Sequence, residues 1–221
     1  MKIYYAKGEH KYTIILLHGL YCDYACFETL VNRLTQVSNN IKMIIPNAPV
    51  RDIDWPSGKE KDIRSWYNYF TCRDGESQHD DIDIEHYKSQ CKRVEDIIMR
   101  ELDNIASQNI VLIGESQGGT IVSGLSLQLK QQLGGFILLD SVFMDNIIVP
   151  STIYKIYKNI YIYSSENDEI YTISLQKDSV KRLQIEDYIV EWYTDKGVTH
   201  GEYGPNRDNF VISQIQKIFS I

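Results

Sequence analysis

The sequence predicts a single α/β domain over residues 1–221, with a mostly parallel central sheet covered by helices on both faces. Two observations indicate this architecture. Short apolar segments alternate along the chain with segments of helical periodicity, and most of the apolar segments are continuous runs. Continuous apolar strands are typical of parallel sheets that are buried on both faces. The sequence contains no internal repeat, low-complexity tract or linker, so nothing in it indicates a second domain.

Six segments are expected to form strands, because each is a short apolar run bounded by polar or turn-forming residues. They cover residues 13–17, 41–45, 109–113, 135–139, 159–163 and 188–193. The last segment is more polar than the others. We therefore expect it to lie nearer an edge of the sheet.

Helices are expected where apolar residues recur at helical spacing. The first follows Asp23, a good N-cap residue, and its apolar positions are Phe27, Leu30, Val31 and Leu34. Further apolar stripes cover residues 87–105, 121–129 and 211–218, and Gly204-Pro205 opens the last of them. Two stretches, residues 46–85 and 141–158, fit no regular element. Long loops in compact domains often have a function, for example as lids.

Composition and charge argue against several classes of protein. The net charge of −7 does not suit nucleic-acid binding, which requires a clustered basic surface. The aliphatic runs are too short to span a bilayer and the N-terminal region has no signal-peptide pattern, so we expect a cytoplasmic protein without stable membrane insertion. The four cysteines form no CxxC pair, so we expect free thiols and no metal site.

The segment around Ser116 carries the strongest functional signal. An apolar strand ends in Gly114-Glu115-Ser116-Gln117-Gly118, and a helix is expected to begin at once. This is the G-x-S-x-G nucleophile elbow in its strand–turn–helix setting, which presents the serine hydroxyl at the carboxyl edge of the sheet. The pattern predicts an α/β-hydrolase fold with Ser116 as the nucleophile. The alternative is a tight strand-to-helix turn in another α/β fold.

Asp168 and His200 are expected to complete a catalytic triad with Ser116. The chain order in this fold is nucleophile, acid, base, and His200 is the only histidine after Ser116. Two aspartates directly follow predicted strands, Asp168 after residues 159–163 and Asp140 after residues 135–139. The fold can place its acid after either strand. We favour Asp168, while Asp140 stays open as the acid or as a turn cap.

A serine hydrolase also needs N–H donors that stabilise the oxyanion of its tetrahedral intermediate. One should be the backbone N–H of Gln117, directly after the nucleophile, and the other the N–H of Leu20, in the loop after residues 13–17. His18 lies in the same loop. We expect it to shape the loop by hydrogen bonding, because a second general base is not required.

The chain resembles the phospholipase/carboxylesterase family, which includes the acyl-protein thioesterases. Four ordered motifs carry the resemblance, namely LLHGL at 16–20, IIPNAP at 44–49, GESQGG at 114–119 and GVTHGE at 197–202. RSWYNYF at 64–70 is similar to a Trp-containing segment of the family. The resemblance implies a cytosolic serine hydrolase without a cofactor that acts on carboxylic esters or acyl thioesters, such as an acylated protein or a lysolipid.

The family's site residues can be carried over to this sequence one by one. Its nucleophile, acid and base fall on Ser116, Asp168 and His200, which favours Asp168 over Asp140. Its oxyanion donors fall on Leu20 and Gln117. For the acyl pocket we expect a border formed by Trp66, Tyr67, Met144, Ile147 and Ile148. Packing in the core is an equally open interpretation of all five residues.

The chain departs from the family pattern at several positions. Tyr21-Cys22 stands where the family usually has Gly-Asp, and Glu115 stands where it usually has an aromatic or apolar residue. The family's Pro-containing segment after the acid is missing. The predicted triad survives these differences, but specificity for long acyl chains on proteins does not follow from the resemblance.

Two further interpretations stay open. A catalytically silent hydrolase-fold protein would bind a ligand or partner and would not react with a fluorophosphonate probe. A small-ester hydrolase or a peptidase on the same scaffold would be distinguished by a panel of esters of increasing chain length.

Overall fold

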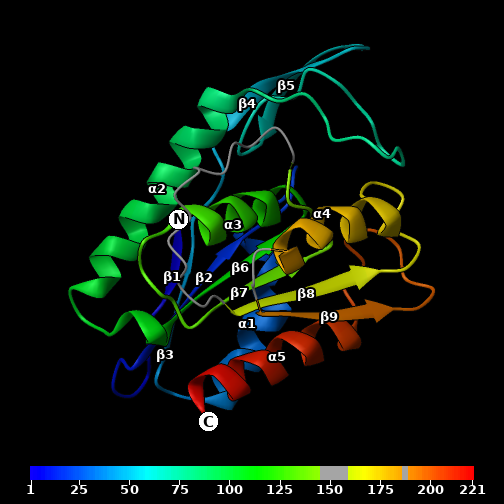
Figure 1. Cartoon of the computed structure of the whole chain (residues 1–221). Helices are drawn as coiled ribbons and strands as arrows, with labels where there is room; N and C mark the ends of the chain where they lie inside the picture. Colours follow the sequence, from blue (N-terminus) through cyan, green and yellow to red (C-terminus); the bar gives the residue numbers. More distant parts are fainter. Residues whose placement is uncertain (145–158, 186–188) are drawn as a thin grey trace.

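The computed structural model describes residues 1–144, 159–185 and 189–221, and a seven-stranded sheet runs through its centre (Figure 1). The strands lie in the order β1 (Lys2–Tyr4), β3 (Ile41–Ile45), β2 (Tyr12–Leu17), β6 (Ile110–Glu115), β7 (Gly135–Leu139), β8 (Asn159–Ser165) and β9 (Ile189–Asp195). β1 pairs with β3 in antiparallel orientation, and the other neighbours pair in parallel.

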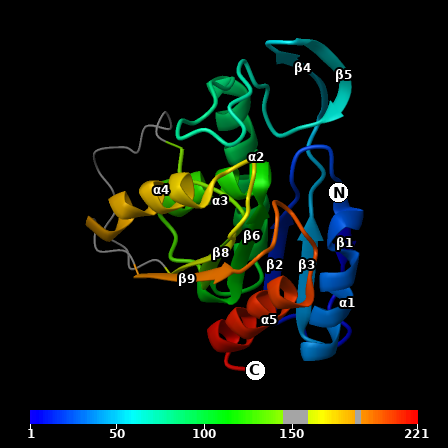
Figure 2. The same ribbon diagram turned by 90° about the vertical axis from the view of Figure 1, so that its right-hand side faces the viewer.

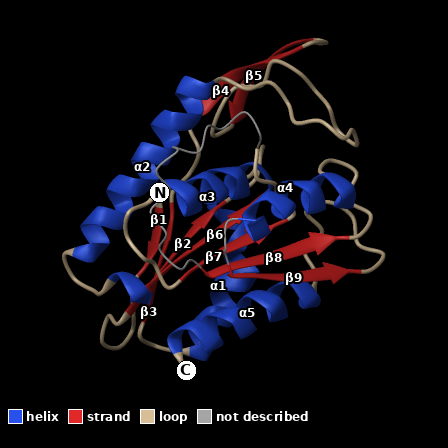
Figure 3. Cartoon of the chain, in the orientation of Figure 1, coloured by secondary structure: helices blue, strands red, loops and turns tan. Residues whose placement is uncertain are grey.

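Helices cover both faces of this sheet (Figure 3). They are α1 (Glu28–Val37), α2 (Ile84–Leu102), α3 (Ser116–Gln128), α4 (Ile173–Ile185) and α5 (Pro205–Phe219), with short 3-10 turns at Tyr24–Phe27 and Ser107–Asn109. Side chains alternate between the faces along each strand. In β2, Ile14 and Leu16 pack with α1 and α5, whereas Ile15 and Leu17 pack with α2 and α3. Both faces are therefore core, which explains the continuous apolar runs.

The predicted fold is confirmed, because the sheet is mostly parallel and has helices on both faces. Each predicted strand and helix is present, and residues 189–193 of the polar segment belong to β9 at one edge of the sheet. Within the main sheet and its covering helices, two elements were not predicted, namely β1, which has only three residues, and α4. No helix within the described ranges is long and apolar enough to cross a bilayer.

The prediction that residues 46–85 form no regular element was wrong for one part of the stretch. β4 (Val50–Trp55) and β5 (Gly58–Arg64) form an antiparallel hairpin that projects beyond the main sheet (Figure 2). Trp55 pairs with Gly58 across a two-residue turn, and Gly58 has a φ of +133° that suits glycine. Most of the hairpin's side chains are exposed or half-buried and charged, so it lacks the apolar periodicity that reveals a strand.

The parallel arrangement brings distant parts of the sequence together at one edge of the sheet. Strands β2, β6, β7, β8 and β9 all run in the same direction, so the segments that follow them lie along the same carboxyl edge. These segments contain Leu20, Ser116, Asp140, Asp168 and His200, respectively. The direction of the strands alone therefore brings the predicted catalytic residues to one edge of the sheet.

Candidate active site

Ser116 occupies a sharp turn between β6 and α3 whose backbone conformation is strained. Its φ is +49°, in the left-handed region that residues with a side chain rarely adopt. A Cβ atom on Gly114 would lie 2.5 Å from the carbonyl oxygen of Gly118. One on Gly118 would lie 2.3 Å from the carbonyl oxygen of Leu17. Both contacts are with backbone atoms that cannot move aside, so glycine is required on either side of the turn.

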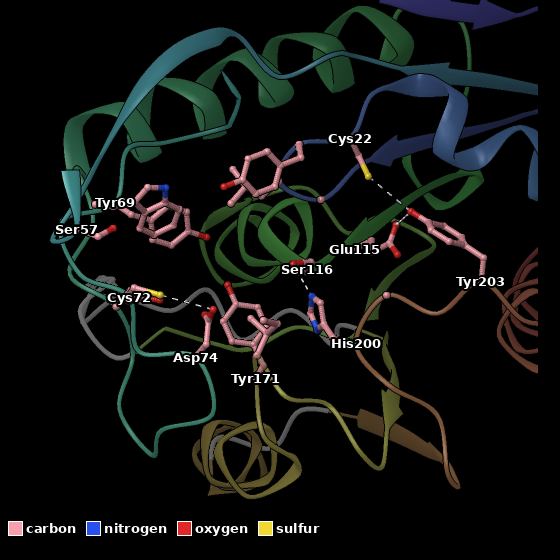
Figure 4. Close-up of a pocket in the computed structure, with 17 residues that line it drawn as sticks. Cys22, Ser57, Tyr69, Cys72, Asp74, Glu115, Ser116, Tyr171, His200 and Tyr203 are labelled. Atoms are coloured by element: carbon pink, nitrogen blue, oxygen red, sulfur yellow. Dashed lines mark hydrogen bonds between the residues drawn. The ribbon is translucent and has the colours of Figure 1, made fainter. Parts of the chain in front are cut away.

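Hydrogen bonds connect Ser116, His200 and Asp168 in series. His200 Nε2 lies 2.9 Å from Ser116 Oγ (Figure 4), and His200 Nδ1 lies 2.8 Å from Asp168 Oδ2. A carboxylate can only accept at this position, so Nδ1 carries the proton and Nε2 is left as the acceptor for the serine hydroxyl. This arrangement can remove the proton from Ser116 as its oxygen attacks an electrophile.

Asp168 is buried and is held by several donors. Its Oδ1 accepts hydrogen bonds from the backbone N–H groups of Ile170 at 2.9 Å and Tyr171 at 2.8 Å. The side-chain amide of Gln176 donates to Oδ2 at 3.1 Å. These bonds fix the orientation of the carboxylate toward His200.

Asp140 makes a different set of contacts. Its Oδ1 accepts from the N–H of Ser165 at 2.7 Å, and its Oδ2 accepts from the Ser165 hydroxyl at 3.0 Å and from the N–H of Gly201 at 3.2 Å. Burial raises the pKa of Asp140 to about 6. Asp140 therefore joins the ends of β7 and β8 to the segment after His200, whereas Asp168 is the aspartate that bonds to the imidazole.

The surroundings of His200 favour its protonated form. Burial acts to lower the pKa of the imidazole, but the hydrogen bond and the charge of Asp168 act to raise it. The negative charges of Asp140 and Glu115 act in the same direction as Asp168. The net result is a pKa above the usual value of 6.5.

The residues expected to supply the oxyanion donors are Leu20 and Gln117. Leu20 borders the same cavity as Ser116. Gln117 is the second residue of α3, and N–H groups in the first turn of a helix have no acceptor within the helix. The Gln117 side chain accepts from the N–H of Trp66 at 2.9 Å and donates to the Ser65 hydroxyl at 2.8 Å, so it ties α3 to the segment after β5.

His18 uses both ring nitrogens within the loop that contains Leu20. Nδ1 donates to the carbonyl oxygen of Gly19 at 2.8 Å, and Nε2 accepts from the N–H of Ala48 at 3.0 Å. Burial lowers the pKa of His18 to about 4, so the ring is neutral at pH 7. These contacts fit the structural role that the sequence suggests for this residue.

A cavity of about 470 Å³ opens beside Ser116 and His200. Aromatic and apolar side chains from separate segments line it, including Leu20, Trp55, Tyr69, Ile170 and Tyr171. In Figure 4, Ser116 and His200 lie between Glu115 and Tyr203 on one side and Tyr69, Cys72 and Asp74 on the other. A cavity of this size and character suits a small organic ligand or part of a larger one.

The structure places the predicted pocket residues Trp66 and Tyr67 elsewhere. Both are fully buried and lie outside the lining of this cavity. Trp66 Nε1 donates to the carbonyl oxygen of His18 at 2.7 Å, and the Tyr67 hydroxyl lies 2.8 Å from Thr120 Oγ1. Met144 is buried next to Tyr67, with its sulfur 3.8 Å from the Tyr67 hydroxyl. Ile147 and Ile148 lie outside the described residues.

The lining position expected of Trp66 and Tyr67 is instead taken by Trp55, Tyr69 and Tyr171. For Trp55 and Tyr69, the signal in the sequence is the aromatic enrichment of the stretch from 55 to 70, and Tyr171 lies outside this stretch. Composition does not show which of its aromatic rings faces a cavity and which faces the core.

The negative charge of Glu115 is neutralised by a cation from α5, an element distant in sequence. It is buried, and its carboxylate forms an ion pair with Arg207 of α5 at 2.8 Å. The Tyr203 hydroxyl donates to the same carboxylate at 3.0 Å. Burial raises the pKa of Glu115, while Arg207 and the hydrogen bonds oppose this shift.

In the part of the chain that the structure describes, no group of three or more His, Cys, Asp or Glu side chains forms a metal site.

Comparison with known proteins gives matches along most of the chain. The family model described as Phospholipase/Carboxylesterase matches residues 1–202. Acyl-protein thioesterase 1 homolog 2 of Dictyostelium discoideum is 32% identical over 151 residues, a match that covers 67% of this chain and 65% of that protein. Acyl-protein thioesterase 1 of Gibberella zeae is 28% identical over 208 residues, covering 90% of this chain and 87% of the relative.

Solved structures show the same fold at lower sequence identity. Arabidopsis thaliana SOBER1 superimposes with a TM-score of 0.80 at 20% identity, covering 95% of this chain and 99% of that one. Zea mays acyl-protein thioesterase 2 superimposes with a TM-score of 0.78 at 18% identity, covering 98% of this chain and 97% of that one. Together with the sheet order, these likenesses show that the chain has the α/β-hydrolase fold.

The crowding at Gly118 gives a stability prediction. Gly118→Ala should lower the free energy of unfolding by about 3 kcal/mol, because the added methyl group meets the carbonyl oxygens of Leu17 and His18. Gly204→Ala is the matched control, since its Cβ would meet nothing within 4 Å and it should cost less than about 1 kcal/mol. Urea denaturation gives the free energy of unfolding of both variants and of the original protein. Equal losses in the two would show that backbone contact is not what requires glycine at 118.

Proposed function

Because the chain belongs to the phospholipase/carboxylesterase family, we propose that it is a serine hydrolase that cleaves carboxylic esters or acyl thioesters with Ser116, His200 and Asp168. One observation carries the proposal. The series of hydrogen bonds from Ser116 through His200 to Asp168, at 2.9 and 2.8 Å, lies at the position where the family's fold performs acyl transfer. A silent binding protein of the same fold would leave this arrangement without a purpose.

The proposed reaction has two stages. His200 takes the hydroxyl proton as Ser116 Oγ attacks the substrate carbonyl, and the N–H groups of Leu20 and Gln117 stabilise the resulting oxyanion. The bond to the leaving group then breaks, and His200 gives its proton to the departing alcohol or thiol. Water hydrolyses the acyl-enzyme by the same route, with His200 again as base, and Ser116 is regenerated.

The substrate class follows from where the stabilising groups act. The oxyanion donors contact the carbonyl oxygen and not the leaving atom, so both oxygen esters and thioesters are chemically suitable. The relatives named acyl-protein thioesterases support a thioester on an acylated protein as one substrate. Direct tests are the hydrolysis of p-nitrophenyl esters and acyl thioesters by the purified protein and covalent labelling by a fluorophosphonate.

The nucleophile is tested by Ser116→Ala. This variant should fold normally, should not be labelled by the fluorophosphonate, and should lose about 10⁴-fold or more in kcat. Ser57→Ala is a matched control, because Ser57 also borders the cavity and should leave turnover within a few-fold of the original. Near-normal hydrolysis by Ser116→Ala would show that the nucleophile lies elsewhere.

The acid is tested by comparing two aspartates. Asp168→Asn should lower kcat by about 10⁴-fold, because an amide in place of the carboxylate favours the wrong tautomer of His200. Asp140→Asn should cost about tenfold or less, because Asp140 bonds to the backbone of the loop and not to the ring. The measurement is kcat for both variants, with folding checked by circular dichroism. A larger loss in Asp140→Asn would reverse the assignment.

The raised pKa of His200 predicts the pH dependence. Only the neutral imidazole can accept the Ser116 proton, so kcat/KM should rise with pH and its midpoint should lie above the usual value of 6.5. Asp168→Asn should move the midpoint of the residual activity downward, because it removes the charge that stabilises the imidazolium. A profile that stays flat from about pH 5 to 8, with the chemical step limiting, would contradict a histidine base.

A further inference from the structure

The end of the cavity away from Tyr203 is built from aromatic rings. Trp55 of the β4–β5 hairpin stacks on Tyr69, with ring centroids 5.0 Å apart and planes 20° apart. Tyr21, from the loop after β2, and Tyr171, from the segment after Asp168, line the same cavity. Aromatic faces attract cations through the negative charge of their π-systems. Figure 4 shows Tyr69 and Tyr171 on the side of Ser116 that also holds Asp74.

Carboxylates accompany these rings. Asp74 and Asp80 both line the cavity. Asp74 is exposed and accepts a weak hydrogen bond from the thiol of Cys72 at 3.6 Å, whereas Asp80 accepts from the Thr71 hydroxyl at 2.8 Å and from the N–H of Arg73 at 2.9 Å. A third carboxylate, Glu60, accepts from the Tyr21 hydroxyl at 2.7 Å and from Trp55 Nε1 at 3.0 Å. Two carboxylates therefore line this end of the cavity, and a third is hydrogen-bonded to two of its aromatic side chains.

Among the described residues, the side chains that line the cavity include no Lys and no Arg. The guanidinium of Arg73, close by in sequence, donates to the carbonyl oxygen of His79 and pairs with Asp81 at 3.0 Å. Lys59 of the hairpin pairs with Asp54 at 3.0 Å. These cations are engaged by other groups, so the charged side chains that the described residues contribute to this end of the cavity are acidic.

We propose that this end of the cavity binds an organic ammonium group of the substrate, so that the enzyme prefers esters or thioesters carrying a positive charge near the acyl linkage. The inference rests on the proposed hydrolase function and specifies its substrate class. An uncharged acyl chain would account for the aromatic rings but not for the carboxylates beside them. A cation is stabilised by both, through the ring faces and through the acidic groups. An anionic substrate is repelled.

A pair of substrates of equal shape isolates the charge. Butyrylthiocholine and S-(3,3-dimethylbutyl) thiobutyrate differ only in that a carbon atom replaces the quaternary nitrogen. The original protein should cleave the charged thioester with a kcat/KM about tenfold higher. Added NaCl should reduce this preference, because screening weakens attraction to the exposed Asp74. A ratio of one or below would overturn the proposal.

Variants locate the effect at this end of the cavity. Asp74→Asn and Trp55→Leu should each lower the ratio of the two kcat/KM values several-fold, because each change removes a group that stabilises the cation. Asp62→Asn is the matched control, because Asp62 is an exposed carboxylate of the same hairpin outside the cavity lining. An equal drop in the control would mean that the preference reflects net charge alone, which also overturns the proposal.

A binding measurement keeps the inference separate from the proposed reaction. Tetramethylammonium should slow fluorophosphonate labelling of Ser116, and Asp74→Asn should weaken this protection several-fold. Unslowed labelling would count against the ammonium site even when hydrolysis is observed. Cleavage of both thioesters by Ser116→Ala would instead count against the proposed nucleophile. n-Butylammonium in the same assay distinguishes a primary from a quaternary ammonium, since aromatic rings favour the less hydrated quaternary ion.

Discussion

The strained turn at Ser116 is the constraint on which the site depends. A positive φ at a residue with a side chain costs about 1–3 kcal/mol and persists only when the surroundings enforce it. Here β6 lies between β2 and β7 in the sheet, and residues 117–126 of α3 are buried. Gly118 is pressed against the carbonyl oxygens of Leu17 and His18, at the start of the loop that contains Leu20. The contact that fixes the proposed nucleophile therefore also fixes the proposed oxyanion donor.

The three buried carboxylates around His200 form a second, electrostatic constraint. Asp168 is satisfied by N–H donors and by the imidazole, Asp140 by Ser165 and Gly201, and Glu115 by Arg207 and Tyr203. A buried charge without such partners would cost several kcal/mol. The pairing explains how the chain tolerates Glu115 where the family usually has an apolar or aromatic residue. The same charges raise the pKa of His200, so groups that hold its loop also set its basicity.

Burial decides which parts of this molecule can be predicted from its sequence. The core strands and helices leave an apolar periodicity, whereas the β4–β5 hairpin is half-exposed and charged and leaves none. Ser116 and His200 follow from local motif and chain order. Asp168 and Asp140 both follow strands, and only the spatial position of the imidazole separates them. Neighbouring aromatics present the same difficulty, because Trp66 faces the core while Tyr69 faces the cavity, and composition cannot distinguish them.

The β4–β5 hairpin lines one end of the cavity and also holds the loop that contains Leu20 and Tyr21. Its Glu60 accepts hydrogen bonds from both Trp55 and Tyr21, and the N–H of Tyr21 donates to the carbonyl oxygen of Arg64 at 3.0 Å. Tyr21 itself has a φ of +64°, so these bonds hold a strained residue directly after Leu20. A substrate group that packed on Trp55 would therefore contact the element that braces the proposed oxyanion donor, the Leu20 N–H. Binding energy from a part of the substrate distant from the carbonyl would in this way hold the proposed donor in place, which is how remote contacts raise kcat and not only affinity.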